Sequence, residues 1–373
     1  MIFMKAIILT ISAGGGHNTA AKAISECLNQ RGIEVVTIDA YKYFNKYLSD
    51  TVEKGYLLST KYVPKLYGRV YRIAEKKADT DIKLKMGAFG SVLVFRKFAR
   101  FIKSQNADVI IATHLFAGEL LTELKERNDM QAKTIGIVTD FTVHPFWEET
   151  DLDYYVTASE LMDYQMEKRG ISKEKLLPFG IPVHPKFSNK MTKLQARKQL
   201  GIPNKNTVFV IAGSMGFGDV VKHIKNLDKS TLDFQIVCVC GNNKKLKEHL
   251  EDIEINKTMF VYGFVNNVDV IMDASDCIVT KPGGLTTSEA LAKGMHLILI
   301  DPIPGQEDRN SEFLLNIGVA TKVTKTFPVD EAVYMFYNNK TKTKYYDKII
   351  DAVSKADAGE KLGDFIENLC KEN

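Results

Sequence analysis

Short apolar runs alternate with helical patterns along most of this chain, and the alternation occurs in two series. The first series has predicted strands at 5–11, 34–38, 108–112, 134–138 and 154–157. The second has them at 208–212, 234–240, 259–262, 277–280 and 297–300. Strands that alternate with helices form a parallel sheet covered by helices on both faces. The pattern therefore predicts an α/β fold with two Rossmann-like domains.

A turn-rich segment at 179–185, Phe-Gly-Ile-Pro-Val-His-Pro, separates the two series. We predict one domain over 1–188, a second over 189–344, and a helical tail over 345–373 that packs back toward the first domain. Ligands of such sheets bind outside the carboxyl ends of the strands. The chemistry is therefore expected in a central cleft that both domains face.

Composition excludes several classes of protein. Hydrophobic residues make up 45% of the chain and charged residues 26%, which is ordinary globular usage and excludes a disordered or fibrous chain. No apolar run approaches the roughly 18 residues of a spanning helix. The five cysteines are odd in number and lack metal-ligand spacing, which is typical of reduced thiols in the cytosol.

The first strand leads into three glycines, 14–16, and then His17. A histidine at a helix N-terminus is disfavoured in its charged form, so a neutral His17 can act as a general base. Gly14, Gly16 and a later Asp39 partly match a dinucleotide fingerprint, but Thr19 occupies its third glycine position. A phosphate-binding Walker loop would need lysine after the glycines.

The second glycine-rich loop follows the strand at 208–212. Gly213, Ser214 and Gly216 offer backbone and hydroxyl donors that suit a diphosphate, although a plain turn explains the same glycines equally well.

The third loop, Lys281-Pro-Gly-Gly-Leu-Thr-Thr-Ser-Glu289, follows the strand at 277–280 and opens a helix. Thr286 and Glu289 have the spacing of a capping box, which is a purely structural explanation. The glycines nevertheless clear space at the helix start, where a Glu289 carboxylate can accept both hydroxyls of a ribose.

The fourth loop, at 301–311, carries Gln306 and Asn310 between prolines and a helix. Side-chain amides supply donors and acceptors together, which suits the hydroxyls of a sugar.

The order of these four motifs resembles that of GT-B glycosyltransferases that use UDP-sugars. Within that fold, the chain is most similar to the monogalactosyldiacylglycerol synthase and processive diacylglycerol glucosyltransferase family. The resemblance extends over about 5–316 and includes the segments 139–147 and 180–184. Asn310 fits the lipid glucosyltransferases better than the peptidoglycan N-acetylglucosaminyltransferase, a more distant relative.

The resemblance implies a role for each motif. His17 would lie beside the acceptor hydroxyl and Glu289 on the ribose, while Phe264 and Val265 would border the uracil. The implied donor site comprises Gly213, Ser214, Gly216, Phe264, Val265, Lys281, Gly284, Leu285, Thr286, Glu289, Gln306 and Asn310. The implied acceptor side comprises Gly15, Gly16, Asp140, His144 and Trp147, of which Asp140 and His144 have equally plausible structural roles.

Two aspartate pairs match the D-x-D pattern of metal-dependent glycosyltransferases. They are Asp79-x-Asp81 and Asp151-x-Asp153. Neither pair follows an apolar strand, so we interpret both as chance matches and predict no metal site.

Positive charge is concentrated in one segment. Residues 41–103 contain 15 Lys or Arg against 5 Asp or Glu, together with 12 of the 35 Phe and Tyr of the chain. Aromatic groups and cations together suit the headgroup boundary of an anionic membrane. A nucleic-acid partner is not expected, because no recognition motif accompanies the charge. The predicted docking residues are Lys83, Lys85, Phe89, Phe95, Arg96 and Lys97.

The sequence and the resemblance together predict an inverting, metal-independent hexosyltransferase. It would move glucose, or less favourably galactose, from a UDP-sugar to diacylglycerol. The N-terminal domain would take the acceptor and dock on the cytoplasmic face of the membrane as a peripheral protein, and the C-terminal domain would bind the donor. No cofactor is expected besides the donor substrate. Two alternatives stay open: a UDP-N-acetylglucosamine-dependent transferase acting on a polyprenyl-linked lipid, and a non-catalytic nucleotide-binding protein.

Overall fold

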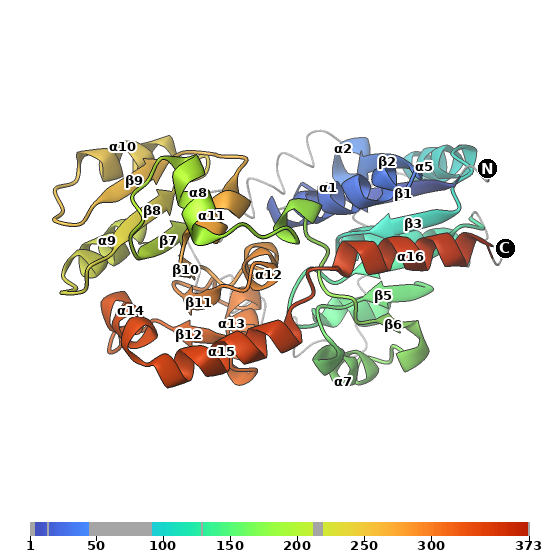
Figure 1. The fold of residues 1–373 in the computed structure, drawn as a ribbon. Coiled ribbons are helices and arrows are strands. Elements are labelled where there is room, and N and C mark those ends of the chain that lie inside the picture. The colour runs from blue at the N-terminus through green and yellow to red at the C-terminus, as the bar shows by residue number, and fades with distance from the viewer. Residues whose placement is uncertain (1–3, 13–14, 45–91, 128–129, 212–218, 372–373) are drawn as a thin grey trace. The chain divides into compact units, whose positions relative to one another are not determined.

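The computed structural model describes residues 4–12, 15–44, 92–127, 130–211 and 219–371, and the chain divides into two α/β units (Figure 1). The first unit comprises Met1–Pro185, Pro304–Gln306 and Asp357–Asn373. The second comprises Lys186–Ile303 and Glu307–Ala356. Each unit is built on a six-stranded sheet.

The sheet of the first unit has the order β2-β1-β3-β4-β5-β6, and every neighbouring pair is parallel. Its strands are β1 (Lys5–Thr10), β2 (Glu34–Asp39), β3 (Val109–Ala112), β4 (Lys133–Ile137), β5 (Tyr154–Val156) and β6 (Leu176–Leu177). Its α-helices are α1 (Gly15–Gln30), α2 (Ala40–Phe44), α5 (Val92–Ser104), α6 (Leu115–Glu126), α7 (Asp163–Glu167) and α16 (Ala358–Lys371). Short 3-10 helices are η1 (Pro145–Glu149), η2 (Glu160–Met162), η3 (Lys173–Lys175) and η4 (Pro185–Phe187), of which η4 spans the change of unit.

The C-terminal helix α16 packs against α1 in the first unit, and two glycines make the close approach possible (Figure 1). A Cβ atom on Gly359 would lie 2.5 Å from the Cys27 sulfur, and one on Gly363 would overlap the Arg31 side chain. The Arg31 guanidinium also pairs with two acidic side chains of α16, those of Asp364 and Glu367. Helix α1, which carries His17, is therefore held by the far end of the chain.

The sheet of the second unit has the order β12-β11-β10-β7-β8-β9 and is also parallel throughout. Its strands are β7 (Thr207–Ile211), β8 (Gln235–Val239), β9 (Met259–Tyr262), β10 (Cys277–Thr280), β11 (His296–Leu299) and β12 (Ala320–Lys322). Its helices are α8 (Lys193–Leu200), α9 (Val220–Asp228), α10 (Lys244–Asp252), α11 (Val268–Ala274), α12 (Gly284–Ala292), α13 (Gln306–Asn316, whose first residue groups with the first unit), α14 (Val329–Asn338) and α15 (Lys340–Val353).

The central strands of both sheets are buried, as the near-continuous apolar runs predicted. In the first unit, Ile8, Ile111 and Ile137 share a core with residues of α1 and α16. In the second unit, Val210 and Val279 share a core with residues of α9 and α14. The predicted α/β fold with two parallel sheets is confirmed.

The structure corrects several details. Helix α1 begins at Gly15, so two of the three glycines, Gly15 and Gly16, lie in its first turn and not in the connection before it. Helix α12 begins at Gly284 and has Gly283 as its N-cap without a side-chain cap, so the predicted capping box at Thr286 is wrong. The segment 345–373 is divided, because α15 groups with the second unit and α16 with the first. Strands β6 and β12, of two and three residues, were not predicted.

Candidate functional site

His17 lies in the first turn of α1, directly beyond the carboxyl end of β1. Its Nδ1 atom is 2.7 Å from the carbonyl oxygen of Thr113, which follows β3. The Thr139 hydroxyl, beyond the end of β4, lies 3.1 Å from the same nitrogen. The neighbouring strands β1, β3 and β4 thus bring the His17 ring, the Thr113 carbonyl and the Thr139 hydroxyl together at Nδ1. Since a carbonyl oxygen can only accept, Nδ1 carries the proton and Nε2 is left with a lone pair.

The electrostatic surroundings of His17 favour its neutral form. Burial lowers the pKa of His17, and the hydrogen bond to the Thr113 carbonyl opposes that shift only in part. Among the described residues, no hydrogen bond to Nε2 is recorded. A neutral imidazole with an available Nε2 lone pair can accept a proton from a substrate hydroxyl.

A second histidine, His114, lies beside His17, and the sequence analysis missed it. The ring of His114 lies edge-on to His17, with the ring centroids 4.5 Å apart. His114 is the N-cap of α6, and His144 is the N-cap of η1. The signal that could have identified His114 is its position two residues beyond the end of the buried strand β3, at the same sheet edge as His17.

The other predicted acceptor residues have varied surroundings. Gly15 is exposed, and Gly16, Asp140 and His144 are partly buried. Trp147 is only 4% exposed and packs edge-on against Tyr155, and its place on the acceptor side stays a prediction.

Glu289 lies on α12 in the second unit, beyond the carboxyl end of β10. The side chain is partly buried, and no hydrogen bond to its carboxylate is recorded among the described residues. Burial raises the pKa of Glu289 to about 8, the Lys186 ammonium opposes this shift, and the Asp269 carboxylate adds to it. A partly buried carboxyl with no recorded hydrogen bond to the described residues is suited, once ionised, to accept hydrogen bonds from a polyol.

The loops before α12 and α13 are tied to each other within the second unit. The Glu307 carboxylate accepts a hydrogen bond from the Ile303 backbone N–H at 2.6 Å and lies 3.5 Å from the Lys281 ammonium. The Asn310 amide donates to the Pro282 carbonyl oxygen at 3.1 Å. The Lys281–Glu307 ion pair and the Asn310–Pro282 hydrogen bond fix the loop that precedes the N-terminus of α12.

Asn310 itself is 0% exposed, and the role of its amide at the sugar stays a prediction. In the structure, this amide holds the carbonyl of Pro282. Gln306 groups with the first unit, where its side-chain amide donates to the Asp140 carboxylate.

The segment after β9 presents the residues expected to border the uracil. Phe264 is 65% exposed, and Val265 is partly buried. The Lys186 ammonium donates to the Asn266 backbone carbonyl oxygen and lies 3.3 Å from the Asp269 carboxylate. Lys186 therefore fixes the end of this segment while its charge acts on Glu289.

At the start of α12, Gly284 and Leu285 are buried, and Thr286 is partly buried. The backbone N–H groups of the first helical turn have no partner within the helix and are suited to an anion. Gly213, Ser214 and Gly216 lie outside the described residues.

The predicted membrane-docking residues are only partly described. Lys83, Lys85 and Phe89 lie outside the described residues. Arg96 and Lys97 are exposed on α5, but Phe95 is 8% exposed and stacks under the Arg127 guanidinium. The docking role of Phe95 stays a prediction, and the exposed side chains described on α5 include the cations Arg96, Lys97 and Arg100. No helix in the described part of the chain is long and apolar enough to cross a membrane.

The carboxylates of the second D-x-D pattern have structural partners. Asp153 accepts hydrogen bonds from the backbone N–H and hydroxyl of Thr134 and pairs with Lys125. Asp151 pairs with Lys175. The first pattern, Asp79-x-Asp81, lies outside the described residues.

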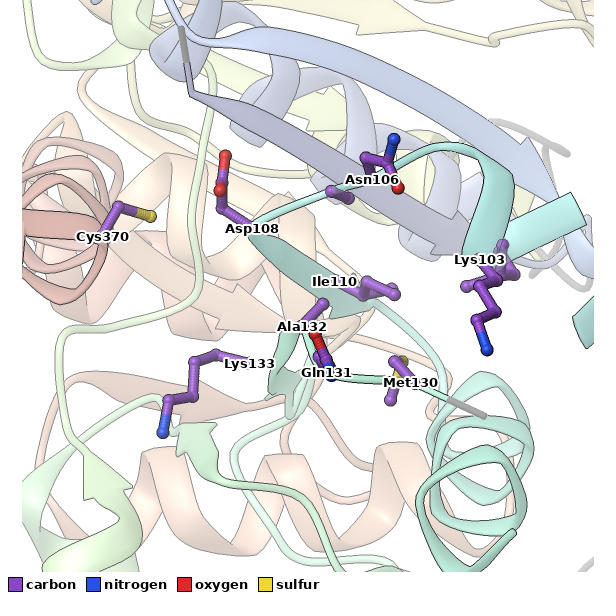
Figure 2. Close-up of a pocket in the computed structure, with 11 residues that line it drawn as sticks. Lys103, Asn106, Asp108, Ile110, Met130, Gln131, Ala132, Lys133 and Cys370 are labelled. Carbon is purple, nitrogen blue, oxygen red and sulfur yellow. The ribbon is translucent and has the colours of Figure 1, made fainter. Parts of the chain in front are cut away.

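A hollow of about 590 Å³ opens at the opposite edge of the first sheet, where β3 and β4 begin (Figure 2). Its lining includes Lys103, Asp108, Lys133 and Cys370, and none of the candidate site residues. The hollow is therefore separate from the histidine site, which lies at the carboxyl ends of the strands.

Comparison with known proteins gives matches to both halves of the chain. The monogalactosyldiacylglycerol synthase model matches residues 17–183, and the model of glycosyl transferases group 1 matches residues 192–323. The solved structure of MurG from Acinetobacter baumannii has a TM-score of 0.62 at 14% identity and covers 98% of this chain and 99% of that one. The Anabaena protein HepE, solved with UDP and glucose, has a TM-score of 0.54 at 12% identity, with 99% and 98% covered. These likenesses establish the GT-B fold.

A curated relative gives the family. The processive diacylglycerol beta-glucosyltransferase of Bacillus pumilus is 31% identical over 339 residues, which are 88% of this chain and 85% of that protein. The protein of the same name from Bacillus cereus is 30% identical over 324 residues, or 86% and 82% of the two chains. The chain belongs to the processive diacylglycerol β-glucosyltransferase family of GT-B glycosyltransferases.

Proposed function

We propose that this protein transfers glucose from UDP-glucose to the free hydroxyl of diacylglycerol and inverts the anomeric carbon. The observation that carries the proposal is the His17 imidazole, whose Nδ1 is bound by the Thr113 carbonyl and whose Nε2 has no recorded partner among the described residues. The family assignment supports the substrates, because the curated relatives are named for β-glucosyl transfer to diacylglycerol.

In this reaction the acceptor oxygen attacks the anomeric carbon as the bond from that carbon to the diphosphate breaks. The hydroxyl proton passes to Nε2 of His17, and UDP leaves with the bonding electron pair. The sugar of UDP-glucose is α-linked, so a single displacement gives a β-glucoside. The relatives are named for that product.

The donor would be bound by the second unit. Glu289 accepts the ribose hydroxyls, and the exposed Phe264 with Val265 borders the uracil. Gly213, Ser214, Gly216 and the N-terminal turn of α12, formed by Gly284, Leu285 and Thr286, are the proposed diphosphate contacts, and Gln306 is the proposed sugar contact.

The leaving diphosphate carries negative charge that the protein's own groups can stabilise. The Lys281 ammonium, held by Glu307, and the N-terminal dipole of α12 provide fixed positive potential. We therefore propose metal-independent transfer, and we expect EDTA to leave the rate unchanged. A strict requirement for an added divalent ion would contradict this part of the proposal.

The acceptor would come from an anionic membrane surface that the first unit contacts from the cytoplasmic side. The exposed cationic face of α5, formed by Arg96, Lys97 and Arg100, supports peripheral docking. Asp140 and His144 are proposed to line the acceptor side next to His17.

A donor panel tests the proposal. The protein is incubated with diacylglycerol in mixed vesicles and, separately, with UDP-glucose, UDP-galactose and UDP-N-acetylglucosamine, and each lipid product is identified by mass spectrometry and by proton NMR of the anomeric position. We expect β-glucosyl-diacylglycerol from UDP-glucose as the main product. An α-linked product, or transfer from UDP-N-acetylglucosamine alone, would show the proposal to be wrong.

A further inference from the structure

His114 caps α6 and packs its ring edge-on against His17, besides a looser ring contact with Phe116 at 6.5 Å, and the architecture of the fold does not explain the contact with His17. Its Nδ1 atom accepts a hydrogen bond from the Phe116 backbone N–H at 3.1 Å, which caps α6. Its ring also lies against His17 at an interplanar angle of 79°. The cap needs an acceptor atom but no ring, and the contact with His17 needs a ring but no acceptor.

The cap determines the protonation of His114. A nitrogen that accepts from a backbone N–H has no proton, so the neutral ring carries its proton on Nε2. Burial lowers the pKa of His114 well below its usual value, and the neighbouring His17 and His144 lower it further. His114 is therefore an uncharged ring that does not compete with His17 for the substrate proton.

The ring contact limits the freedom of His17. The single hydrogen bond from Nδ1 to Thr113 leaves the imidazole free to tilt about that nitrogen, and the Thr139 hydroxyl lies on the same nitrogen. An aromatic ring packed edge-on prefers one relative orientation. The Nε2 atom can be aimed at the acceptor hydroxyl only while the ring plane of His17 is fixed.

We propose that His114 is a positioning residue for the base, and that its ring holds the His17 imidazole in the orientation that keeps Nδ1 on Thr113 and Nε2 directed to the acceptor. This inference rests on the proposed function of His17. Displacing a reacting group by about 1 Å can lower a rate by about 100-fold, so loss of the ring should be visible in kcat.

Two variants separate the ring from the cap. His114→Asn keeps a side-chain acceptor favoured at an N-cap and removes the ring. His114→Phe keeps an aromatic ring of similar size and removes the acceptor. No hydrogen bond to Nε2 of His114 is recorded among the described residues, so phenylalanine leaves no known partner unpaired there.

We expect His114→Asn to lower kcat by about 10- to 100-fold while KM for UDP-glucose and Tm stay near the wild-type values. We expect His114→Phe to keep kcat within about threefold and to lower Tm by about 2–4 °C through loss of the cap. Wild-type kcat in His114→Asn, or an equal loss of kcat in both variants, would overturn the inference.

A spectroscopic measurement tests the positioning role of His114 without an activity assay. In protein labelled with 15N-histidine, the signals of His17 are assigned by their absence in His17→Ala. We expect a single Nδ1–H tautomer in wild type and His114→Phe, and a mixture of tautomers in His114→Asn. An unchanged His17 spectrum in His114→Asn would contradict the positioning role. By contrast, an active His17→Ala variant would contradict the proposed function itself.

Discussion

The Nδ1 atom of His17 is bound by the carbonyl oxygen of Thr113, 96 residues further along the chain, at 2.7 Å. A backbone carbonyl, rather than a carboxylate, thus sets the tautomer of the proposed base. The carbonyl itself is fixed because the Thr113 backbone N–H donates to Leu9 at the end of β1. The base is consequently positioned by the sheet, and side-chain changes at Thr113 should affect it little.

Replacing Glu289 tests the donor site. Glu289→Gln keeps the shape of the side chain but removes the charge that would accept two ribose hydrogen bonds. Hydrogen bonds to charged groups contribute about 1.5–3 kcal/mol, so UDP-glucose should bind roughly tenfold or more weakly above the Glu289 pKa of about 8, where the wild-type carboxyl is ionised. Isothermal titration calorimetry measures the affinity, and Glu312→Gln, at an exposed position on α13, is the matched control. Equal affinity in wild type and Glu289→Gln would exclude the ribose role.

The raised pKa of Glu289 predicts a pH dependence of donor binding. With the pKa at about 8, the carboxyl is mostly protonated at pH 6 and accepts hydrogen bonds better as it ionises. Affinity for UDP-glucose should therefore rise by about tenfold or more between pH 6 and pH 8. UDP-glucose is the appropriate probe because, unlike UDP, it has no terminal phosphate that titrates in this range.

Ionisation of Glu289, which should strengthen donor binding, should lower the stability of the folded protein. Because folding raises the pKa of Glu289, the protonated carboxyl stabilises the folded state relative to the unfolded one. This contribution to the free energy of unfolding is fully present below the unfolded pKa and is lost as the pH rises through about 8. Glu289→Gln should therefore remove both this stability loss and the pH dependence of binding. If binding to the variant rises with pH as steeply as in wild type, another group is responsible.

The packing of α16 on α1 is testable by a paired substitution. A Cβ atom at residue 359 would meet the Cys27 sulfur at 2.5 Å, so Gly359→Ala should destabilise the protein by about 1–3 kcal/mol. The combination Gly359→Ala with Cys27→Ala removes the sulfur and should recover most of that loss. Denaturant unfolding measures both, and equal destabilisation with and without Cys27 would show that the contact does not limit the packing.

The cationic face of α5 predicts salt-sensitive membrane binding. Changing Arg96 and Lys97 to glutamate reverses two exposed charges and should abolish co-sedimentation with anionic vesicles at low salt, since each cation contributes about 1 kcal/mol. The control is Lys222→Glu with Lys225→Glu, two exposed lysines of α9 in the second unit. Equal loss in both double variants would mean that net charge, and not this face, determines binding.

The sequence pattern predicted the sheets and the loops at their carboxyl ends because both depend on the pattern of residue types within short segments of the chain. An apolar run followed by glycines marks a buried strand and a ligand loop wherever it occurs. On this basis His17, Lys281 and Glu289 were selected as candidate site residues.

Features that depend on distant contacts were not predictable in this way. His114 follows β3 without any glycine, and its relation to His17 exists only because β1 and β3 are neighbours in the sheet. Asn310 and Trp147 have the polarity and aromaticity of ligand contacts, yet tertiary packing buries both. Gly359 and Gly363 are unfavourable in an isolated helix, and their purpose appears only in the contact with α1.

The most direct test of the account is turnover by His17→Ala, measured as formation of glucosyl-diacylglycerol from UDP-glucose, with UDP-glucose affinity determined on the same preparations. Removal of a general base costs about 10²–10⁴ in rate, so we predict a loss of that size with affinity within about twofold of wild type. A variant that retains most of its turnover, or one that loses donor affinity along with turnover, would contradict the account.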